Sequence, residues 1–241
     1  MKIIILCAGK GRRMFINYPK SLLKINTKHS LLKNIYLNFI KRGIKSRDII
    51  FATGYRPALI KKEIGEKVNF IHNNKYASTN MVYTLMNTVK KIDDDIIITY
   101  SDIVYDIQNI KKIINNKSQF VTFIDKKWKA LWKIKNKLES DTETLKIKDN
   151  FILELGKKTK NIKSIQARYV GLTKISKKNL ELIKTIYFDQ VKKNPKRFLK
   201  IDMTNFFNFL IKNNFKLNYL QIVGKWDEFD DENDYKNYLE I

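Results

Sequence analysis

The sequence predicts an α/β fold with a mixed, mainly parallel sheet flanked by helices and a small β insertion. Apolar runs of strand length recur at residues 3–6, 48–54, 68–72 and 95–102. Helical spacing of apolar residues appears between them, as in residues 31–42, where Gly43 is a typical helix stop. Because strands that alternate with helices favour a parallel sheet, and 241 residues suit one domain, we expect a single domain over residues 1–241.

The charge of the chain allows a nucleic-acid partner but does not favour one. Lys and Arg number 48 against 24 Asp and Glu, a formal charge of +24. A basic excess is typical of nucleic-acid-binding proteins, but here it is almost all lysine and is scattered along the chain. Zinc-finger spacing, an RNP-like sequence and a basic tail are all missing. We therefore interpret the charge as a solvated surface that attracts anionic substrates, and expect no nucleic acid as partner.

Cysteine use and hydropathy indicate a cytoplasmic protein without membrane insertion. The single Cys7 cannot form an internal disulfide, which fits a reducing compartment. No apolar run reaches the length of a membrane span, and no leader with a cleavage site is visible. We interpret Cys7 as a small packing residue at the end of the first strand.

The first strand leads into a basic, glycine-containing loop, Gly9-Lys10-Gly11-Arg12-Arg13, and Pro19-Lys20 follows closely. Glycine lets the backbone approach a ligand, and successive N–H groups can point at anionic oxygens. The loop matches neither the dinucleotide fingerprint nor the GKS/GKT phosphate loop. By itself a basic loop after a first strand is weak evidence for a phosphate site, and a basic loop on an unrelated α/β domain is the alternative.

The spacing of this stretch resembles that of a known enzyme family. Leu6-x-Ala8-Gly9-x-Gly11-x-Arg13, followed by Pro19-Lys20, resembles the nucleotidyltransferases that activate sugars, choline phosphate and phosphonates with nucleoside triphosphates. The resemblance implies a Rossmann-like, GT-A-like fold. It also implies catalytic roles for Arg13, Lys20 and Asp102, and nucleotide contacts from the first loop and from Ser101, which precedes Asp102. The nucleotide-binding residues that it implies in the first loop are Leu6, Ala8, Gly9, Gly11, Arg12, Arg13 and Lys20.

A second polar stretch, residues 73–85, precedes a helix. Ser78, Thr79 and Asn80 are good helix caps, and a helix start also offers free N–H groups to a nucleobase or ribose. An ordinary cap is the alternative. The stretch resembles the segment of phosphocholine cytidylyltransferases whose helix start holds cytosine, with departures at Met81 and Thr84. The resemblance implies that CTP is the nucleotide.

A carboxylate ends the strand predicted over residues 95–102. Ligands of open parallel sheets bind at the carboxyl ends of strands, so Asp102 and the first loop can meet. A role as a helix cap is the alternative for Asp102. The resemblance implies that Asp102 and Asp230, in the segment 224–230, are the protein ligands of Mg²⁺. Few carboxylates suffice because phosphates and waters complete the shell of this ion.

Residues 125–172 are predicted to form the β insertion and the acceptor pocket, with a hairpin at 145–155. Trp128 and Trp132 lie one helical turn apart, and Asp141 and Glu143 follow them. Such a set can hold a cationic amine, with two core tryptophans as the alternative. The segment looks like that of phosphonate-activating cytidylyltransferases, although Thr142 and Arg168 depart from their pattern and favour an altered acceptor. The predicted acceptor-binding residues are Trp128, Trp132, Asp141, Glu143, Lys157 and Arg168, the last two holding the anionic end of the acceptor.

These observations predict a cytidylyltransferase that joins CMP to a small phosphonate or phosphate monoester and releases pyrophosphate. We expect Mg²⁺ as cofactor and no general base, because the attacking oxygen is already anionic at neutral pH. The expected acceptors are 2-aminoethylphosphonate, another phosphonate, phosphocholine or a phosphorylated amino compound used in a capsule or lipid head group. Two alternatives stay open: a sugar-1-phosphate nucleotidyltransferase that uses another nucleotide, and a non-catalytic nucleotide- or RNA-binding protein.

Overall fold

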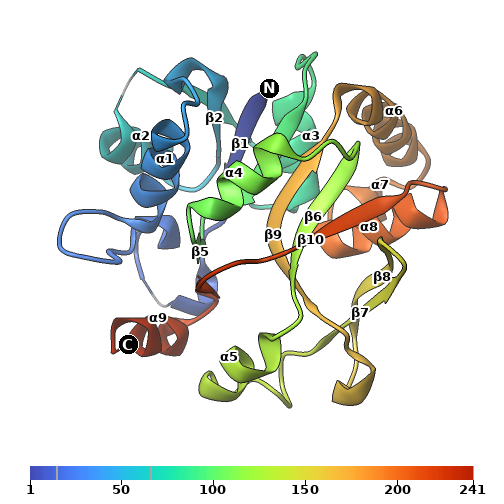
Figure 1. The fold of residues 1–241 in the computed structure, drawn as a ribbon. Coiled ribbons are helices and arrows are strands. Elements are labelled where there is room, and N and C mark those ends of the chain that lie inside the picture. The colour runs from blue at the N-terminus through green and yellow to red at the C-terminus, as the bar shows by residue number, and fades with distance from the viewer. Residues whose placement is uncertain (15, 66, 241) are drawn as a thin grey trace.

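The computed structural model describes residues 1–14, 16–65 and 67–240. A mixed β-sheet forms the centre of its fold (Figure 1). Within those residues it has nine strands in the order β3-β2-β1-β4-β9-β6-β10-β8-β7. The pairings place β9 and β8 antiparallel to the other strands, so the prediction of a mixed, mainly parallel sheet is confirmed. The strands are β1 (Lys2–Cys7), β2 (Ile49–Thr53), β3 (Asn69–His72), β4 (Ile96–Tyr100), β6 (Phe120–Asp125), β7 (Glu143–Lys148), β8 (Phe151–Lys158), β9 (Arg168–Ile175) and β10 (Leu217–Gln221).

Helices cover both faces of the sheet, because its strands are apolar on both sides. In β1, Ile4 and Leu6 pack into one apolar cluster, and Ile3 and Ile5 into another. The first cluster includes α3 (Met81–Val89), α6 (Lys177–Lys193), α7 (Pro195–Phe198) and α8 (Met203–Lys212). The second includes α1 (Leu31–Lys41), α2 (Pro57–Ile64), α4 (Gln108–Asn115) and α5 (Trp128–Ile134). Among the described residues, no helix is both long and apolar enough to cross a membrane.

The order of the strands creates a binding crevice beside β1. The chain runs outward through β2 and β3 and then returns to β4 on the opposite side of β1 (Figure 1). Ligands of open α/β sheets bind at such a reversal point, outside the carboxyl ends of the strands. Since Leu6 pairs in register with Tyr100, the loop after β1 and the residues after β4 emerge side by side.

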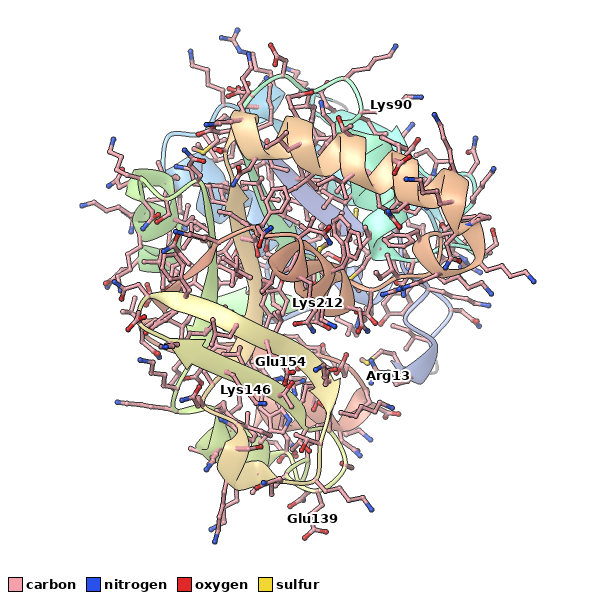
Figure 2. All side chains as sticks on the ribbon, turned by 90° about the vertical axis from the view of Figure 1, so that its right-hand side faces the viewer. Arg13, Lys90, Glu139, Lys146, Glu154 and Lys212 are labelled. Atoms are coloured by element: carbon pink, nitrogen blue, oxygen red, sulfur yellow. The ribbon has the colours of Figure 1, made fainter. Side chains whose placement is uncertain are left out.

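The expected β insertion at residues 125–172 is continuous with the main sheet. The predicted hairpin is present: β7 and β8 turn at Asp149 with a positive φ of 53°, and they join the sheet through β10. Lys146 and Glu154 face each other across it, 3.6 Å apart (Figure 2). The expected boundary needs a correction, because β9 lies between β4 and β6 in the middle of the sheet. A long antiparallel return strand carries no local sign of its place in a sheet.

A short ribbon brings the C-terminal segment to the crevice. Strand β5 (Ile103–Tyr105) pairs antiparallel with β11 (Trp226–Glu228), and α9 (Glu232–Leu239) follows. The Phe229 backbone N–H donates to the carbonyl oxygen of Asp102 at 2.9 Å. Asp102 and Asp230 are therefore brought together by backbone pairing, although they lie far apart in the sequence. The sequence analysis did not predict this ribbon.

Candidate active site

A cavity of about 320 Å³ lies at the carboxyl ends of β1 and β4. Its walls come from the loop after β1, the start of α3, the end of β4 and the segment before α9. The predicted residues that line it are Leu6, Ala8, Gly9, Gly11, Arg13, Lys20, Thr79, Asn80, Ser101, Asp102 and Asp230. The structure thus gathers into one cavity residues that the sequence analysis assigned to the phosphates, the base and the metal.

The glycine loop is shaped around the stem of Lys20. Gly11 has a φ of 63°, and a Cβ added there would lie 3.0 Å from the Cβ of Lys20. Glycine is therefore required both by the backbone conformation and by the space available. A short 3-10 helix, Arg12–Met14, then carries Arg13 to the cavity. The predicted side chain of Arg12 lies outside the described part of the structure.

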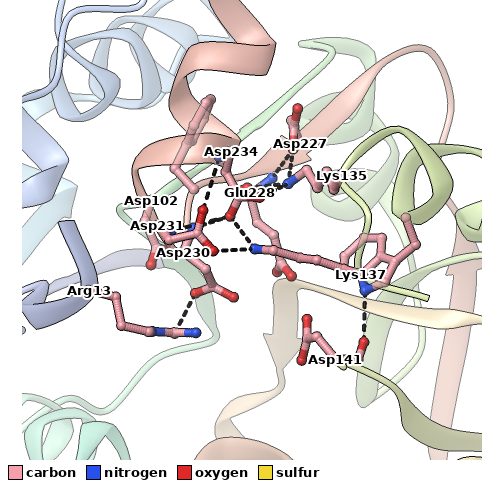
Figure 3. Close-up of polar contacts among 12 residues, drawn as sticks. Arg13, Asp102, Lys135, Lys137, Asp141, Asp227, Glu228, Asp230, Asp231 and Asp234 are labelled. Atoms are coloured by element: carbon pink, nitrogen blue, oxygen red, sulfur yellow. Dashed lines mark hydrogen bonds and ion pairs between the residues drawn. The ribbon is translucent and has the colours of Figure 1, made fainter. Parts of the chain in front are cut away.

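Lys20 lies between the two predicted metal ligands. Its ammonium nitrogen is 2.5 Å from Asp102 Oδ2 and 3.9 Å from Asp230 Oδ1, and it donates to the Phe229 carbonyl oxygen at 3.1 Å. Arg13 contacts Asp230 at 2.8 Å (Figure 3). Burial lowers the pKa of Lys20, but the Asp102 and Asp230 carboxylates outweigh it and hold that pKa above its ordinary value.

This arrangement also tests whether the two carboxylates fit a divalent ion. Both already converge on one cation, the ammonium group of Lys20. Carboxylate oxygens from two separate segments, beside a basic loop, form a donor set that Mg²⁺ accepts when phosphate oxygens supply further ligands. Asp102 and Asp230 therefore fit the role that the sequence analysis gave them.

The start of α3 forms the opposite wall, but its polar side chains are partly engaged. Asn80 caps the helix by accepting from the Met81 N–H at 2.7 Å and donates to the Lys200 carbonyl oxygen at 3.1 Å. The Thr79 hydroxyl donates to the Lys75 carbonyl oxygen at 2.7 Å. Ser78 is exposed and is not among the residues that line the cavity, so its predicted contact with the base lacks support from the geometry.

The cavity also has wall residues that the sequence analysis missed. Tyr76 precedes α3, Thr84 lies in its first turn, Ser21 follows Lys20, and Tyr100 ends β4. Ser21 Oγ is buried and lacks a hydrogen-bond partner among the described residues. The position of Tyr100, two residues before Asp102 at a strand end, was a usable signal. Ser21, between Lys20 and the apolar pair Leu22-Leu23, offered none beyond its place next to Lys20.

The tryptophan pair does not line a pocket, which corrects the prediction. Trp128 and Trp132 are 1% and 0% exposed, and their rings meet edge to face at 6.1 Å. The spacing placed both rings on one face of α5 as expected, but that face packs against the sheet. The Trp132 indole N–H donates to the Asp141 carbonyl oxygen at 2.8 Å. Both rings belong to the apolar core and offer no face to a substrate.

The two predicted basic contacts of the acceptor are also engaged within the protein. Arg168 lies 4.2 Å from the centre of the Trp132 ring and contacts Asp141 at 3.0 Å and Glu228 at 3.2 Å. The expected cation over tryptophan is thus the guanidinium of the chain itself. Lys157 is exposed and pairs with Glu154 on the same strand. Arg168 is thus held by carboxylates of the chain itself, whereas the contact of the exposed Lys157 with an acceptor stays a prediction.

Carboxylates surround Arg168 and extend toward the cavity. Asp141, Glu228 and Asp230 each place one oxygen within 4.8 Å of the others. Asp141 and Glu143 line a separate hollow of about 340 Å³. Burial raises the pKa of Glu143, although the charge of Arg168 opposes the shift. Burial likewise raises the pKa of Glu228 to about 7. This side of the site therefore carries more acidic than basic side chains.

The chain has similar proteins of known sequence and structure, although no family model matches it. It is 32% identical to the CTP:phosphoglutamine cytidylyltransferase of Campylobacter jejuni subsp. jejuni, over 100% of both chains. The solved CTP:phosphocholine cytidylyltransferase from Streptococcus pneumoniae has a TM-score of 0.71 and 18% identity, with 99% of this chain and 97% of that one covered. The inositol-1-phosphate CTP transferase of T. maritima has a TM-score of 0.72 and 15% identity, covering 98% and 94%. These two structures share the fold over nearly the whole chain.

Proposed function

Because this chain belongs to the nucleotidyltransferase family, we propose that it transfers CMP from CTP to a phosphorylated amino compound and releases pyrophosphate. Membership supports the enzyme class, and it weighs against a non-catalytic nucleotide- or RNA-binding protein. The name of the full-length relative supports the choice of CTP and of a phosphorylated acceptor that has an amine.

The observation that carries the proposal is the position of Lys20. A basic loop, a lysine and two carboxylates meet at the reversal point of the sheet, in a cavity of about 320 Å³. The Gly9–Gly11 backbone allows close approach of a triphosphate, and Arg13 and Lys20 supply positive charge. In our proposal Lys20 leaves Asp102 for the phosphates when the nucleotide binds.

The proposed reaction needs positioning and charge neutralisation more than proton transfer. An anionic oxygen of the acceptor attacks the α-phosphorus of CTP, and the bond from that phosphorus to the bridging oxygen of pyrophosphate breaks. Arg13 and Lys20 stabilise the charge that collects on the departing pyrophosphate. Asp102 and Asp230 are the residues that would hold Mg²⁺, which when bound would neutralise phosphate charge.

The acidic side of the site supports an acceptor with a cationic amine. Asp141, Glu228 and Asp230 lie close together, and Glu143 lines the hollow with Asp141. Arg168 pairs with Asp141 and Glu228, and Lys158 and Lys160 also line the hollow. In our proposal Glu143 and Asp141, which line the hollow, bind the amine, and not the buried tryptophans. A phosphorylated amino acid, 2-aminoethylphosphonate and phosphocholine all meet this requirement. A sugar phosphate would call for hydroxyl partners instead.

The test is a pyrophosphate-release assay of four nucleoside triphosphates against a panel of acceptors with Mg²⁺. The panel holds phosphoglutamine, 2-aminoethylphosphonate, phosphocholine, amine-free analogues of equal size and glucose 1-phosphate. We expect CTP with amine-bearing acceptors to react fastest, and Asp102→Asn to abolish turnover. The matched control is Asp149→Asn in the distant β7–β8 turn, where the φ of 53° also suits asparagine. Preferred turnover of UTP or TTP with the sugar phosphate would overturn the proposal.

A further inference from the structure

A buried network of lysines and aspartates joins the end of α5 to the segment that carries Asp230 (Figure 3). The Lys135 ammonium lies 2.5 Å from Asp227 Oδ1 and 3.5 Å from Asp234 Oδ1, and it donates to the Glu228 carbonyl oxygen at 2.5 Å. The Lys135 and Asp234 side chains are only 1% and 0% exposed. Two formal charges are therefore held almost fully out of water, which is costly unless each has several partners.

Asp234 uses this position to hold the backbone of Asp230. Its Oδ2 accepts from the Asp230 N–H at 2.7 Å and from the Asp231 N–H at 3.3 Å. The Lys137 ammonium lies 2.6 Å from the same oxygen and 2.9 Å from Asp231. One carboxylate thus fixes the peptide just before the Asp230 side chain, and two lysines that follow α5, Lys135 and Lys137, fix that carboxylate.

Stability alone is a poor reason for this network. A buried ion pair is often no more stabilising than apolar side chains of similar volume, whereas it does impose one geometry. The geometry imposed here is that of the turn between β11 and α9, which sets where the Asp230 carboxylate points relative to Asp102 and Lys20.

We propose that Asp234, supported by Lys135 and Lys137, is a positioning residue for Asp230. The inference rests on the proposed function, in which Asp230 helps to hold the divalent ion on the triphosphate. Groups that orient a metal ligand typically change metal affinity by about 10–100-fold when they are replaced. The network also joins α5, next to the acidic acceptor side, to the metal side of the cavity.

A purely structural role makes a different prediction. Asp231 and Asp234 also form the capping box of α9, so losing Asp234 weakens the helix start in any case. The matched control is Ser176→Ala, which removes the side-chain cap of α6 at the Asn179 N–H, outside the cavity walls. A capping role predicts that Asp234→Asn and Ser176→Ala both lower the free energy of unfolding and leave metal affinity unchanged.

The experiment measures Mn²⁺ binding to the CTP complex by electron paramagnetic resonance, together with denaturant unfolding of each variant. We expect Asp234→Asn to raise the dissociation constant of Mn²⁺ about tenfold or more. Ser176→Ala should leave it unchanged. Lys137→Met, which removes one partner of Asp234 at a less buried position, should weaken Mn²⁺ binding in the same direction and serves if Asp234→Asn does not fold. In Asp230→Asn, the added Asp234→Asn change should have no further effect.

Two outcomes separate the inference from the proposed function. If Asp230→Asn binds Mn²⁺ as tightly as the wild type, Asp230 is not a metal ligand. The positioning role of Asp234 is then refuted as well. If Asp230→Asn loses the ion while Asp234→Asn and Lys137→Met bind it like Ser176→Ala, the metal ligand stands. The positioning role is then overturned.

Discussion

The nucleotide loop after β1 and the predicted acceptor segment differ in how well the sequence predicted their exposure. Both showed a clear local pattern, but only the pattern in the loop led to residues that line the cavity. In the loop after β1, Gly9, Gly11, Arg13 and Lys20 line the cavity, and the Arg13 side chain is 67% exposed. In the acceptor segment the aromatic pair is buried, and its cation is Arg168 of the chain itself. A loop directly after a central strand has its place fixed by the sheet. Helical spacing fixes which side chains share a face, but not where that face points.

The largest expected effect tests whether Trp132 is core or pocket. Trp132→Ala should lower the free energy of unfolding by about 3–5 kcal/mol, because a fully buried ring is replaced by a cavity. Tyr76→Ala, at a partly exposed cavity wall, should cost about 1 kcal/mol or less but raise the KM for CTP. Denaturant unfolding and steady-state kinetics measure both. A stable Trp132→Ala enzyme that has lost only acceptor affinity would restore the original pocket prediction.

A substitution of Lys20 tests the nucleotide side of the site. Lys20→Ala should lower kcat by about 10²-fold, or roughly 2.7 kcal/mol, because a charge aimed at the leaving pyrophosphate is lost. The control is Lys24→Ala, an exposed lysine nearby, which should keep its rate. Single-turnover kinetics at saturating CTP separate the two roles. Weak CTP binding with a normal rate at saturation would mean that Lys20 contributes only to binding.

Much of the fold could be predicted because several strands are recognisable from the local sequence. The runs in β1, β2 and β4 are apolar on both faces, and each ends at a polar or glycine-containing loop. Their order around β1 then follows from the usual α/β pattern. The place of β9 in the middle of the sheet could not be predicted, because antiparallel pairing depends on which distant strand is free to accept it.

The site could be predicted where a residue is tied to a strand end and not where it depends on packing. Asp102 follows β4, and its place beside the first loop is a consequence of topology. Asp230 was assigned to the site only through the family resemblance. Its position near Asp102 depends on the β5–β11 ribbon. The burial of Trp128 and the pairing of Arg168 depend on contacts between segments far apart in the chain, which no local pattern specifies.

Glu228 offers a pH test of the buried acceptor side. Burial raises its pKa from the ordinary 4.5 to about 7, so the folded state favours the neutral carboxyl. That contribution to stability is fully present below pH 4.5 and is lost as the pH rises through 7. Subtracting the unfolding free energy of Glu228→Gln from that of the wild type should give a difference that falls by on the order of 2 kcal/mol over this window. The exposed Glu232→Gln should give a flat difference.

The smallest expected effect concerns the amine of the acceptor. Glu143 is half-buried beside Asp141 in the hollow next to the cavity, so its carboxylate can contact an ammonium group without becoming fully exposed. Glu143→Gln keeps the shape and removes the charge. The ratio of kcat/KM for an amine-bearing acceptor to that for its amine-free analogue should therefore fall by about 3–10-fold, the value of one charge-assisted hydrogen bond in a partly solvated site. Glu181→Gln, an exposed glutamate on α6, should leave the ratio unchanged. An equal loss for both acceptors would make Glu143 part of the scaffold, and the amine would then have to be sought at Asp141 and Glu228.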